Sequence, residues 1–259
     1  FNTAVGFGAM FENTTGDNCT AVGTGALGLN TTGSDNVAVG RNALNAVTTQ
    51  GANVAVGYNA STNLVTTGVT AIGYQAMATS TTGYDTVAVG QSSLTACTTG
   101  NQNTAVGFNS MIASTTGANN VAVGHAALDA NTTGSGNVAV GQDAGGAITT
   151  GANNICIGID CGDTTTTGDT NILIGNTARA SASGGANQIA MGVVATCVGD
   201  NNFTFGNQGT DSNIAFGATS ITAPSDIRLK EDIQDEEVGL NFINDLRPVT
   251  FLWKKEKDI

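Results

Sequence analysis

The sequence predicts an all-β protein: a parallel β-roll, or solenoid, of about twelve 17-residue coils, followed by the start of a small α+β domain. Three observations predict this fold. The motif V-A-V-G and its variants recur along residues 1–200. Gly, Ala, Thr and Asn dominate residues 1–224, and such small side chains cannot fill a conventional globular core, so order must come from stacked repeats. The periodicity stops at Pro224, so we expect degenerate coils over 201–224 and a second unit over 225–259.

The motif glycines recur every 17 residues, apart from one spacing of 16 between Gly57 and Gly73. The twelve motif glycines are Gly6, Gly23, Gly40, Gly57, Gly73, Gly90, Gly107, Gly124, Gly141, Gly158, Gly175 and Gly192. Shorter, degenerate turns end on Gly206 and Gly217. Seventeen residues are too few for a βαβ unit, so we expect two short strands and two turns in each coil.

Each position of the repeat has a physical interpretation. V-A-V is a short β-branched strand whose alternate side chains face opposite ways. The small residue three positions after each motif glycine indicates a tight interior site. An Asn four positions before the glycine predicts an internal amide ladder, and paired threonines, Thr66–Thr67 among them, predict a second ladder. The ladder asparagines are Asn2, Asn36, Asn53, Asn103, Asn120, Asn137, Asn154 and Asn171.

The charge of the chain excludes several classes of partner. The formal net charge is −12, and residues 1–224 carry Arg41 and Arg179 against eleven carboxylates. Without a basic patch, binding of nucleic acid through phosphates is not expected there. No apolar run reaches the length of a membrane span, so we expect no membrane insertion.

Five cysteines fall at five different phases of the repeat, so none builds the architecture: Cys19, Cys97, Cys156, Cys161 and Cys197. The sequence has no C-x-x-C motif, and its one histidine, His125, is far from the cysteines in sequence. We expect no metal site and no cofactor, while the spacing leaves cysteine pairing open.

The motif N-x-A-V-G-x-x-A resembles the head repeat of trimeric autotransporter adhesins, and similar runs occur in phage tail fibres. The resemblance covers roughly residues 1–200 and implies a left-handed β-roll packed as a homotrimer. The V-A-V strand supports a trimer independently, because it is apolar on both faces: one face can fill the thin roll while the other meets partner chains.

Variable residues at the first and second positions after the motif glycine are expected on the outer surface. They are Phe7, Arg41, Asn42, Tyr58, Tyr74, Gln91, Phe108, His125, Gln142 and Asp143. A fibre could bind a host-surface glycan or receptor through these residues. Any single one of them can equally be an ordinary solvated turn residue. An ice-binding solenoid is disfavoured, because adjacent threonines of a strand cannot both face outward. A polysaccharide depolymerase is disfavoured as well, because no clustered pair of carboxylates precedes residue 225.

The C-terminal residues carry a second resemblance. S-D-x-R-L-K-x-x-I, followed by L-R-P-V-T-F-x-W-K, is similar to the endosialidase-type intramolecular chaperone that ends many phage tailspikes and tail fibres. Members trimerise, help the preceding β-structured stalk to fold, and cut themselves off before the motif serine. The resemblance implies that Ser225 is the nucleophile, Lys230 its base, and Pro224–Ser225 the bond that is cut.

This dyad is chemically demanding. Lysine can act as a base only if burial or a neighbouring charge lowers its pKa toward neutrality. The alternative is that Ser225 caps a turn and Lys230 is solvated. Residues 225–259 would form the N-terminal part of a chaperone domain, with a helix over 238–246 and a strand over 249–253.

Together these features predict a structural and adhesive fibre protein of a virion, a phage-type tail fibre shaft, whose only enzymatic activity would be self-cleavage. The alternative is a cellular, extracellular surface adhesin or a filament subunit built from the same coils. Self-association is expected in both cases, as a homotrimer or as a longer filament.

Overall fold

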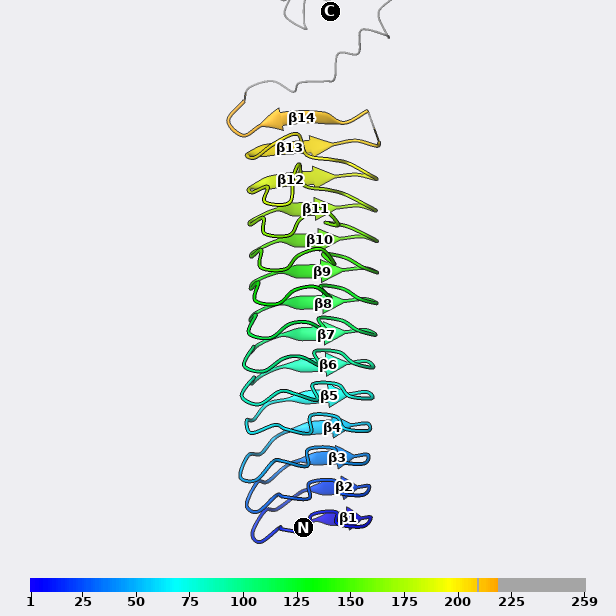
Figure 1. Cartoon of the computed structure of the whole chain (residues 1–259), viewed down its shortest axis with the longest axis vertical. Coiled ribbons are helices and arrows are strands. Elements are labelled where there is room, and N and C mark those ends of the chain that lie inside the picture. The colour runs from blue at the N-terminus through cyan, green and yellow to red at the C-terminus, as the bar shows by residue number, and fades with distance from the viewer. Residues whose placement is uncertain (209, 219–259) are drawn as a thin grey trace, which may run out of the picture. The chain divides into compact units, whose positions relative to one another are not determined.

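The computed structural model describes residues 1–208 and 210–218 and gives them a parallel β-solenoid fold (Figure 1). One sheet of fourteen strands follows the order of the sequence. No helix occurs in these residues, and so none that could cross a membrane. We number the coils by their motif glycines, so that coil 1 contains Gly6 and coil 12 contains Gly192. The strands are β1 Thr3–Val5, β2 Thr20–Val22, β3 Val37–Val39, β4 Val54–Val56, β5 Thr70–Ile72, β6 Val87–Val89, β7 Thr104–Val106, β8 Val121–Val123, β9 Val138–Val140, β10 Ile155–Ile157, β11 Ile172–Ile174, β12 Gln188–Met191, β13 Asn202–Phe205 and β14 Ser212–Ala215.

Each coil places its strand directly against the equivalent strand of the next coil. Strands β1 to β13 pair in parallel with no slip of the repeat, as in the pairs Val37↔Val54 and Val121↔Val138. The middle alanine of the strand faces the interior and is fully buried in coils 2 to 9. The predicted β-roll of about twelve coils is therefore confirmed.

The expectation of two strands in each coil is wrong. The threonine side of the coil is a stack of turns, because several donors converge on one carbonyl and no strand ladder can form. The oxygen of Thr48 accepts bonds from the backbone nitrogens of Thr31, Thr32 and Gly33 at 2.8, 3.1 and 3.3 Å. It also accepts the Thr31 hydroxyl at 3.0 Å.

The threonine ladder exists, but coil 4 departs from it. The first threonine of a pair donates its hydroxyl to the carbonyl of its copy on the next coil, as Thr132 does to Thr149 at 3.0 Å. In coil 4, which is one residue shorter, Val65 takes this position and donates its backbone nitrogen to Thr81 O at 2.9 Å. The prediction that Thr66–Thr67 belong to the ladder in register is wrong by one position.

The amide ladder is confirmed. Asn154 is fully buried, and its Oδ1 accepts bonds from the backbone nitrogen and the Nδ2 of Asn171, both at 3.0 Å. Its own Nδ2 donates to Gly168 O at 2.7 Å and to Asn137 Oδ1 at 3.1 Å. The ladder thus satisfies polar groups inside the roll.

The motif glycine is required by close packing of coil on coil. Gly23 has φ +134°, and a Cβ there would lie 2.6 Å from the carbonyl carbon of Gly40. Such a contact is far below van der Waals distance, and L-residues rarely adopt this φ.

Core volume is conserved from coil to coil by paired exchanges. Most coils bury Leu or Met four positions after the glycine, but coil 4 has Ser61 there and buries Leu64 three residues later instead. The hydroxyl of Ser61 is buried without a hydrogen-bond partner. In coil 4 the large buried side chain therefore lies three residues later than in most other coils, and the interior remains filled.

The last described strand reverses direction. β14 pairs antiparallel with β13, in the register Asn202↔Ala215. Gly217 follows Gly206 by fewer residues than any full coil has, so the chain turns back instead of completing another circuit. The sequence interpretation of Gly217 as the end of one more coil is therefore wrong. The chain divides into two units after Pro224, and residues 219–259 lie outside the described part.

Candidate interaction surface

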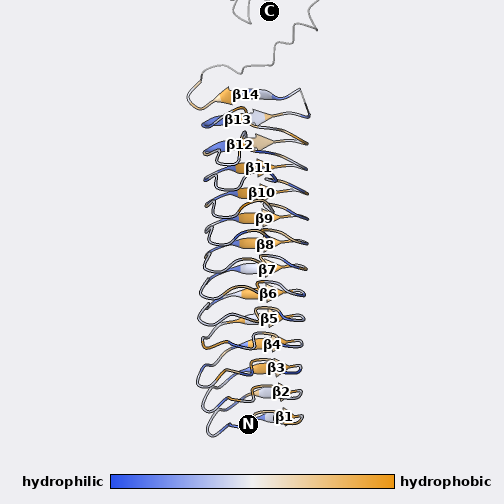
Figure 2. Ribbon diagram, in the orientation of Figure 1, coloured by the Kyte–Doolittle hydropathy of each residue, from blue (hydrophilic) through white to orange (hydrophobic). Residues whose placement is uncertain are grey.

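The outer face of the sheet is an apolar strip built by the strand residues that flank the buried alanine. In coil 8, Ala122 is fully buried, while Val123 on the other face is 37% exposed. Val140 and Ile157, which follow in the same column, are 38% and 39% exposed. Figure 2 colours most strands from β3 to β11 as hydrophobic. An aligned column of β-branched side chains therefore runs along the stack without cover from its own chain.

Beside this strip runs a second exposed column, the post-glycine column, formed by the residue directly after each motif glycine. Its described members are Phe7, Thr24, Arg41, Tyr58, Tyr74, Gln91, Phe108, His125, Gln142, Ile159, Asn176 and Val193, and all of them are exposed. The expectation of an outward surface is confirmed for this first position, whereas Asn42 and Asp143 at the second position are only partly exposed. Because the coils stack in register, side chains of this column lie directly above one another.

Aromatic members of the post-glycine column stack along the fibre axis. The rings of Tyr58 and Tyr74 have centroids 5.3 Å apart and planes 12° apart. The guanidinium carbon of Arg41 lies 5.8 Å from the centre of the Tyr58 ring. The Tyr58 ring thus has Arg41 and Tyr74 as neighbours, one face of Tyr74 is covered by Tyr58, and both tyrosines remain partly exposed.

Two amides occupy the column next to the one that holds this aromatic stack. Asn42 and Asn59, each one residue beyond the post-glycine column, have φ of 57° and 53°. The Nδ2 of Asn42 donates to Asn59 Oδ1 at 3.1 Å. Together with Arg41, Tyr58 and Tyr74 they form a polar-aromatic patch, which we call the Arg41–Tyr74 patch. Such a patch can accept and donate hydrogen bonds to a ligand rich in hydroxyl groups.

The sequence interpretation missed a carboxylate near His125. Asp143 Oδ1 lies 4.0 Å from His125 Nδ1, and the imidazole stacks on Phe108 with ring centroids 5.3 Å apart. Burial, and then the neighbouring charge of Asp143, raise the pKa of Asp129, while a backbone hydrogen bond from Ala130 opposes them. Asp143 follows His125 in the sequence by one coil plus one position. A comparison of all residue pairs with this spacing would have predicted the His125–Asp143 contact.

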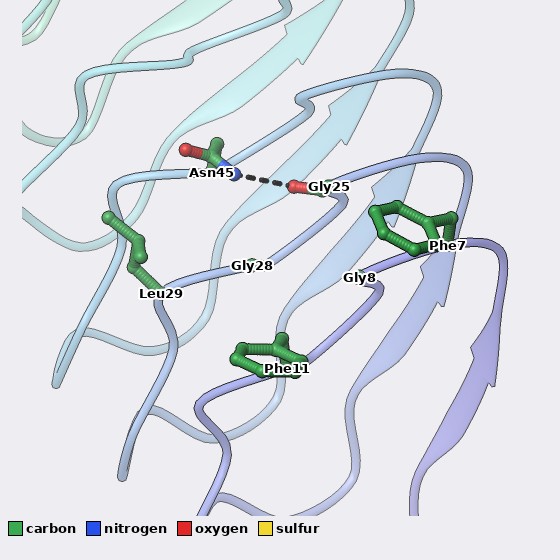
Figure 3. Close-up of a pocket in the computed structure, with 7 residues that line it drawn as sticks. All are labelled: Phe7, Gly8, Phe11, Gly25, Gly28, Leu29 and Asn45. Carbon is green, nitrogen blue, oxygen red and sulfur yellow. Dashed lines mark hydrogen bonds between the residues drawn. The ribbon is translucent and has the colours of Figure 1, made fainter.

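An apolar hollow of about 340 Å³ lies near the N-terminal end of the stack (Figure 3). Phe7, Phe11 and Leu29 line it, and Asn45 donates its Nδ2 to Gly25 O at 2.7 Å. The lining contains no titratable or nucleophilic side chain. It therefore offers surface for contact but no group for chemistry.

The structure shows no metal-type cluster in residues 1–208 and 210–218, where no three His, Cys, Asp or Glu side chains gather. All five cysteines are buried free thiols. The predicted dyad of Ser225 and Lys230, and the Pro224–Ser225 bond, lie outside the described residues.

One comparison with known proteins bears on these undescribed residues. Residues 225–259 match the family model described as the chaperone of endosialidase. Neither a curated protein nor a solved structure matches the chain. The chain thus combines a described β-solenoid with a C-terminal segment that is similar to the chaperone of endosialidase.

Proposed function

We propose that this chain is the shaft of a viral, phage-type tail fibre that serves host attachment and carries a folding chaperone at its C-terminal end. The solenoid and the C-terminal family match fit a fibre-type structural protein. The observation that carries the proposal is the apolar strip, whose side chains, such as Val123, Val140 and Ile157, remain partly exposed along the stack.

The apolar strip supports assembly as a homotrimer. Three copies arranged about a common axis would bury the strips against one another, and the constant register of the coils aligns the side chains of each strip. Burial of an aligned apolar strip is favourable at roughly 25 cal/mol per Å² of apolar surface. Side chains such as Val123 and Val140 would lie in this interface.

The trimer is tested by sedimentation equilibrium on the full chain and on two double variants. Val123→Glu with Val140→Glu places charges on the strip, and Thr116→Glu with Thr133→Glu places the same number of charges on the threonine side of adjacent coils. We expect three chains per particle for the parent and the threonine variant, and dissociation for the valine variant. A monomeric parent, or equal masses for both variants, would contradict the proposed interface.

The C-terminal segment is proposed to release the shaft by self-cleavage between Pro224 and Ser225. The intact mass of the purified protein is compared with the masses of Ser225→Ala and Lys230→Met variants, and with Ser220→Ala as the matched control. We expect two fragments from the parent and the control, and a single uncut chain from the other two. An uncut parent would sink the self-cleavage proposal but leave the trimer proposal standing.

The Arg41–Tyr74 patch is the proposed contact with a host-surface glycan or receptor. Because the ring faces of Tyr58 and Tyr74 are already stacked, we expect hydrogen bonds from their hydroxyls and from the amides of Asn42 and Asn59, not stacking of a sugar on a ring. Binding to a glycan panel should fall for Tyr58→Phe with Tyr74→Phe, which keeps the stack and removes only the hydroxyls. Gln142→Ala, in the same column, is the control, and unchanged binding by the Phe variant would exclude this patch.

A further inference from the structure

Coil 10 differs from all other coils by two cysteines that face the same interior. Cys156 is the middle residue of β10, a position held by alanine in coils 1 to 9, and Cys161 lies three positions after Gly158, where other coils have Ala or Ser. Both are fully buried. The two replacements occur in one coil, so they put two thiols where the strand and the following turn pack against each other.

The structure places both side chains beside Leu173 of the next coil. Cys156 pairs with Leu173 across β10 and β11, and its neighbour Cys161, together with burial, raises the pKa of the Cys156 thiol. Gly162 has φ +76°, and a Cβ there would lie 2.7 Å from Cys156 Sγ, so the absence of a side chain at this position leaves space for the sulfur. The Cys161 thiol also donates to Leu173 O at 3.1 Å.

The other three cysteines have different surroundings. Cys19 and Cys97 donate to backbone carbonyls, to Gly33 O at 3.4 Å and to Gly100 O at 3.3 Å. Cys197 lies in coil 12 beside Thr204. These three lie in three separate coils, several strand spacings of ~4.8 Å apart along the stack, so none reaches another cysteine.

We propose that Cys156 and Cys161 are a disulfide-forming pair, joined across coil 10 when the chain folds in the presence of a small-molecule or protein disulfide as oxidant. The thiolate of one cysteine attacks a sulfur of the oxidant and expels one thiolate, which gives a mixed disulfide. The second cysteine then attacks the protein sulfur of that mixed disulfide and expels the other thiolate. The two protons from the cysteines pass to the two departing thiolates, so the protein pair is oxidised and the oxidant is reduced to two thiols.

Burial decides when this exchange takes place. In the folded coil both sulfurs are inaccessible to an external disulfide, and thiols held in apolar surroundings react slowly. The bond therefore forms before coil 10 closes. Once formed, it ties strand β10 to the turn after it, in an array whose coils are otherwise held only by their neighbours.

The experiment uses the full chain, refolded once with oxidised glutathione and once with a reductant. Free thiols are blocked with N-ethylmaleimide in denaturant, disulfides are then reduced, and the released thiols are labelled with iodoacetamide and located by tandem mass spectrometry. We expect iodoacetamide on Cys156 and Cys161 after oxidative refolding, and N-ethylmaleimide on Cys19, Cys97 and Cys197. Blocking of all five by N-ethylmaleimide, or iodoacetamide on a different pair, overturns the proposal.

Matched variants separate the bond from a packing effect. Cys156→Ala and Cys161→Ala restore the residue that other coils have at these positions, so each should fold and leave its partner blocked by N-ethylmaleimide. Cys97→Ser, which introduces the residue found at Ser80 and Ser114, should leave the 156–161 label intact. Addition of reductant should lower the urea midpoint of the oxidised parent and leave that of the alanine variants unchanged; equal shifts in both would also overturn the proposal.

Discussion

Arg179 of coil 11 donates two parallel hydrogen bonds to Asp163 of coil 10, from Nε to Oδ1 at 2.8 Å and from Nη2 to Oδ2 at 2.6 Å. These hydrogen bonds, which Arg179 donates to Asp163, raise the pKa of the guanidinium, which is charged at any working pH in either case. The described part of the chain contains two arginines among eleven carboxylates, and this one is committed to a contact between neighbouring coils.

Removal of the Arg179–Asp163 ion pair should lower the free energy of unfolding only slightly. Both side chains are about one third exposed, so solvent screens the pair, and Asp163→Asn should lower the free energy of unfolding by about 0.2–1 kcal/mol. The loss should shrink at high salt, since ions screen the parent's attraction. Urea unfolding at low and high salt measures it, with Glu12→Gln as a control that removes a charge elsewhere. A salt-independent loss would show that packing, and not charge, is responsible.

Replacement of a motif glycine should be among the most damaging changes to the shaft. Gly23→Ala combines a disfavoured φ with a Cβ forced against the carbonyl of the next coil, so we expect a loss of more than about 2 kcal/mol in unfolding free energy. Gly199→Ala is the matched control, because a Cβ there has no atom within 4 Å. Equal stability of the two variants in urea unfolding would contradict the role given to coil-on-coil contact.

The asparagine ladder predicts a further loss. Asn137→Ala removes the acceptor of Asn154 N at 2.9 Å and the donor to Gly151 O at 2.8 Å, and leaves both groups buried. We expect unfolding free energy to fall by about 1–3 kcal/mol, the usual cost of an unsatisfied buried polar group. Asn207→Ala, at an exposed position, should change it by less than about 0.5 kcal/mol. Thermal unfolding followed by circular dichroism distinguishes these outcomes, and a harmless Asn137→Ala would mean that the ladder contributes no net stability.

The thiol of Cys197 predicts a loss of stability at alkaline pH. Burial raises the pKa of this thiol to about 11, against an opposing hydrogen bond with Thr204. The folded state therefore holds the proton longer than the unfolded chain, so the stabilisation is complete below pH 9 and is lost as the pH rises toward 11. This loss amounts to about 2–3 kcal/mol.

Unfolding midpoints measured between pH 8 and pH 11 test this thiol. Cys197→Ala should show a shallower decline than the parent, and Val198→Ala, at an exposed neighbouring position, should keep the parent's slope. Parallel curves for Cys197→Ala and the parent would mean that this thiol titrates equally in both states.

Features that depend on one type of residue at one position of the repeat could be predicted from the sequence. The V-A-V strands, the buried alanine and the Asn154-type ladder all follow from a fixed period and from the size and polarity of a side chain. The absence of a second strand from each coil could not be foreseen, because the convergence of three backbone nitrogens on Thr48 O depends on turn geometry and not on composition.

The candidate surface was predictable in part. The outward post-glycine column followed from its variability, but the stacking of Tyr58 on Tyr74 needs a rotamer that the sequence does not fix. The His125–Asp143 contact crosses between two columns of adjacent coils and was missed for that reason. Ser225 and Lys230 remain predictions, since they lie outside the described residues.

The reversal of β14 has a consequence for how such proteins can change length. Every strand up to β13 offers the next one an edge of the same direction, so duplication or loss of one whole repeat in the gene lets the parallel backbone ladder of the remaining strands form again. Strand β14 pairs with the free edge of β13 in the opposite direction. One more copy of the repeat inserted after β14 would therefore not find an edge with which its strand can pair in the same parallel register. We therefore expect variants of this fibre to differ by whole coils before β13 and to keep the reversed strand itself unchanged.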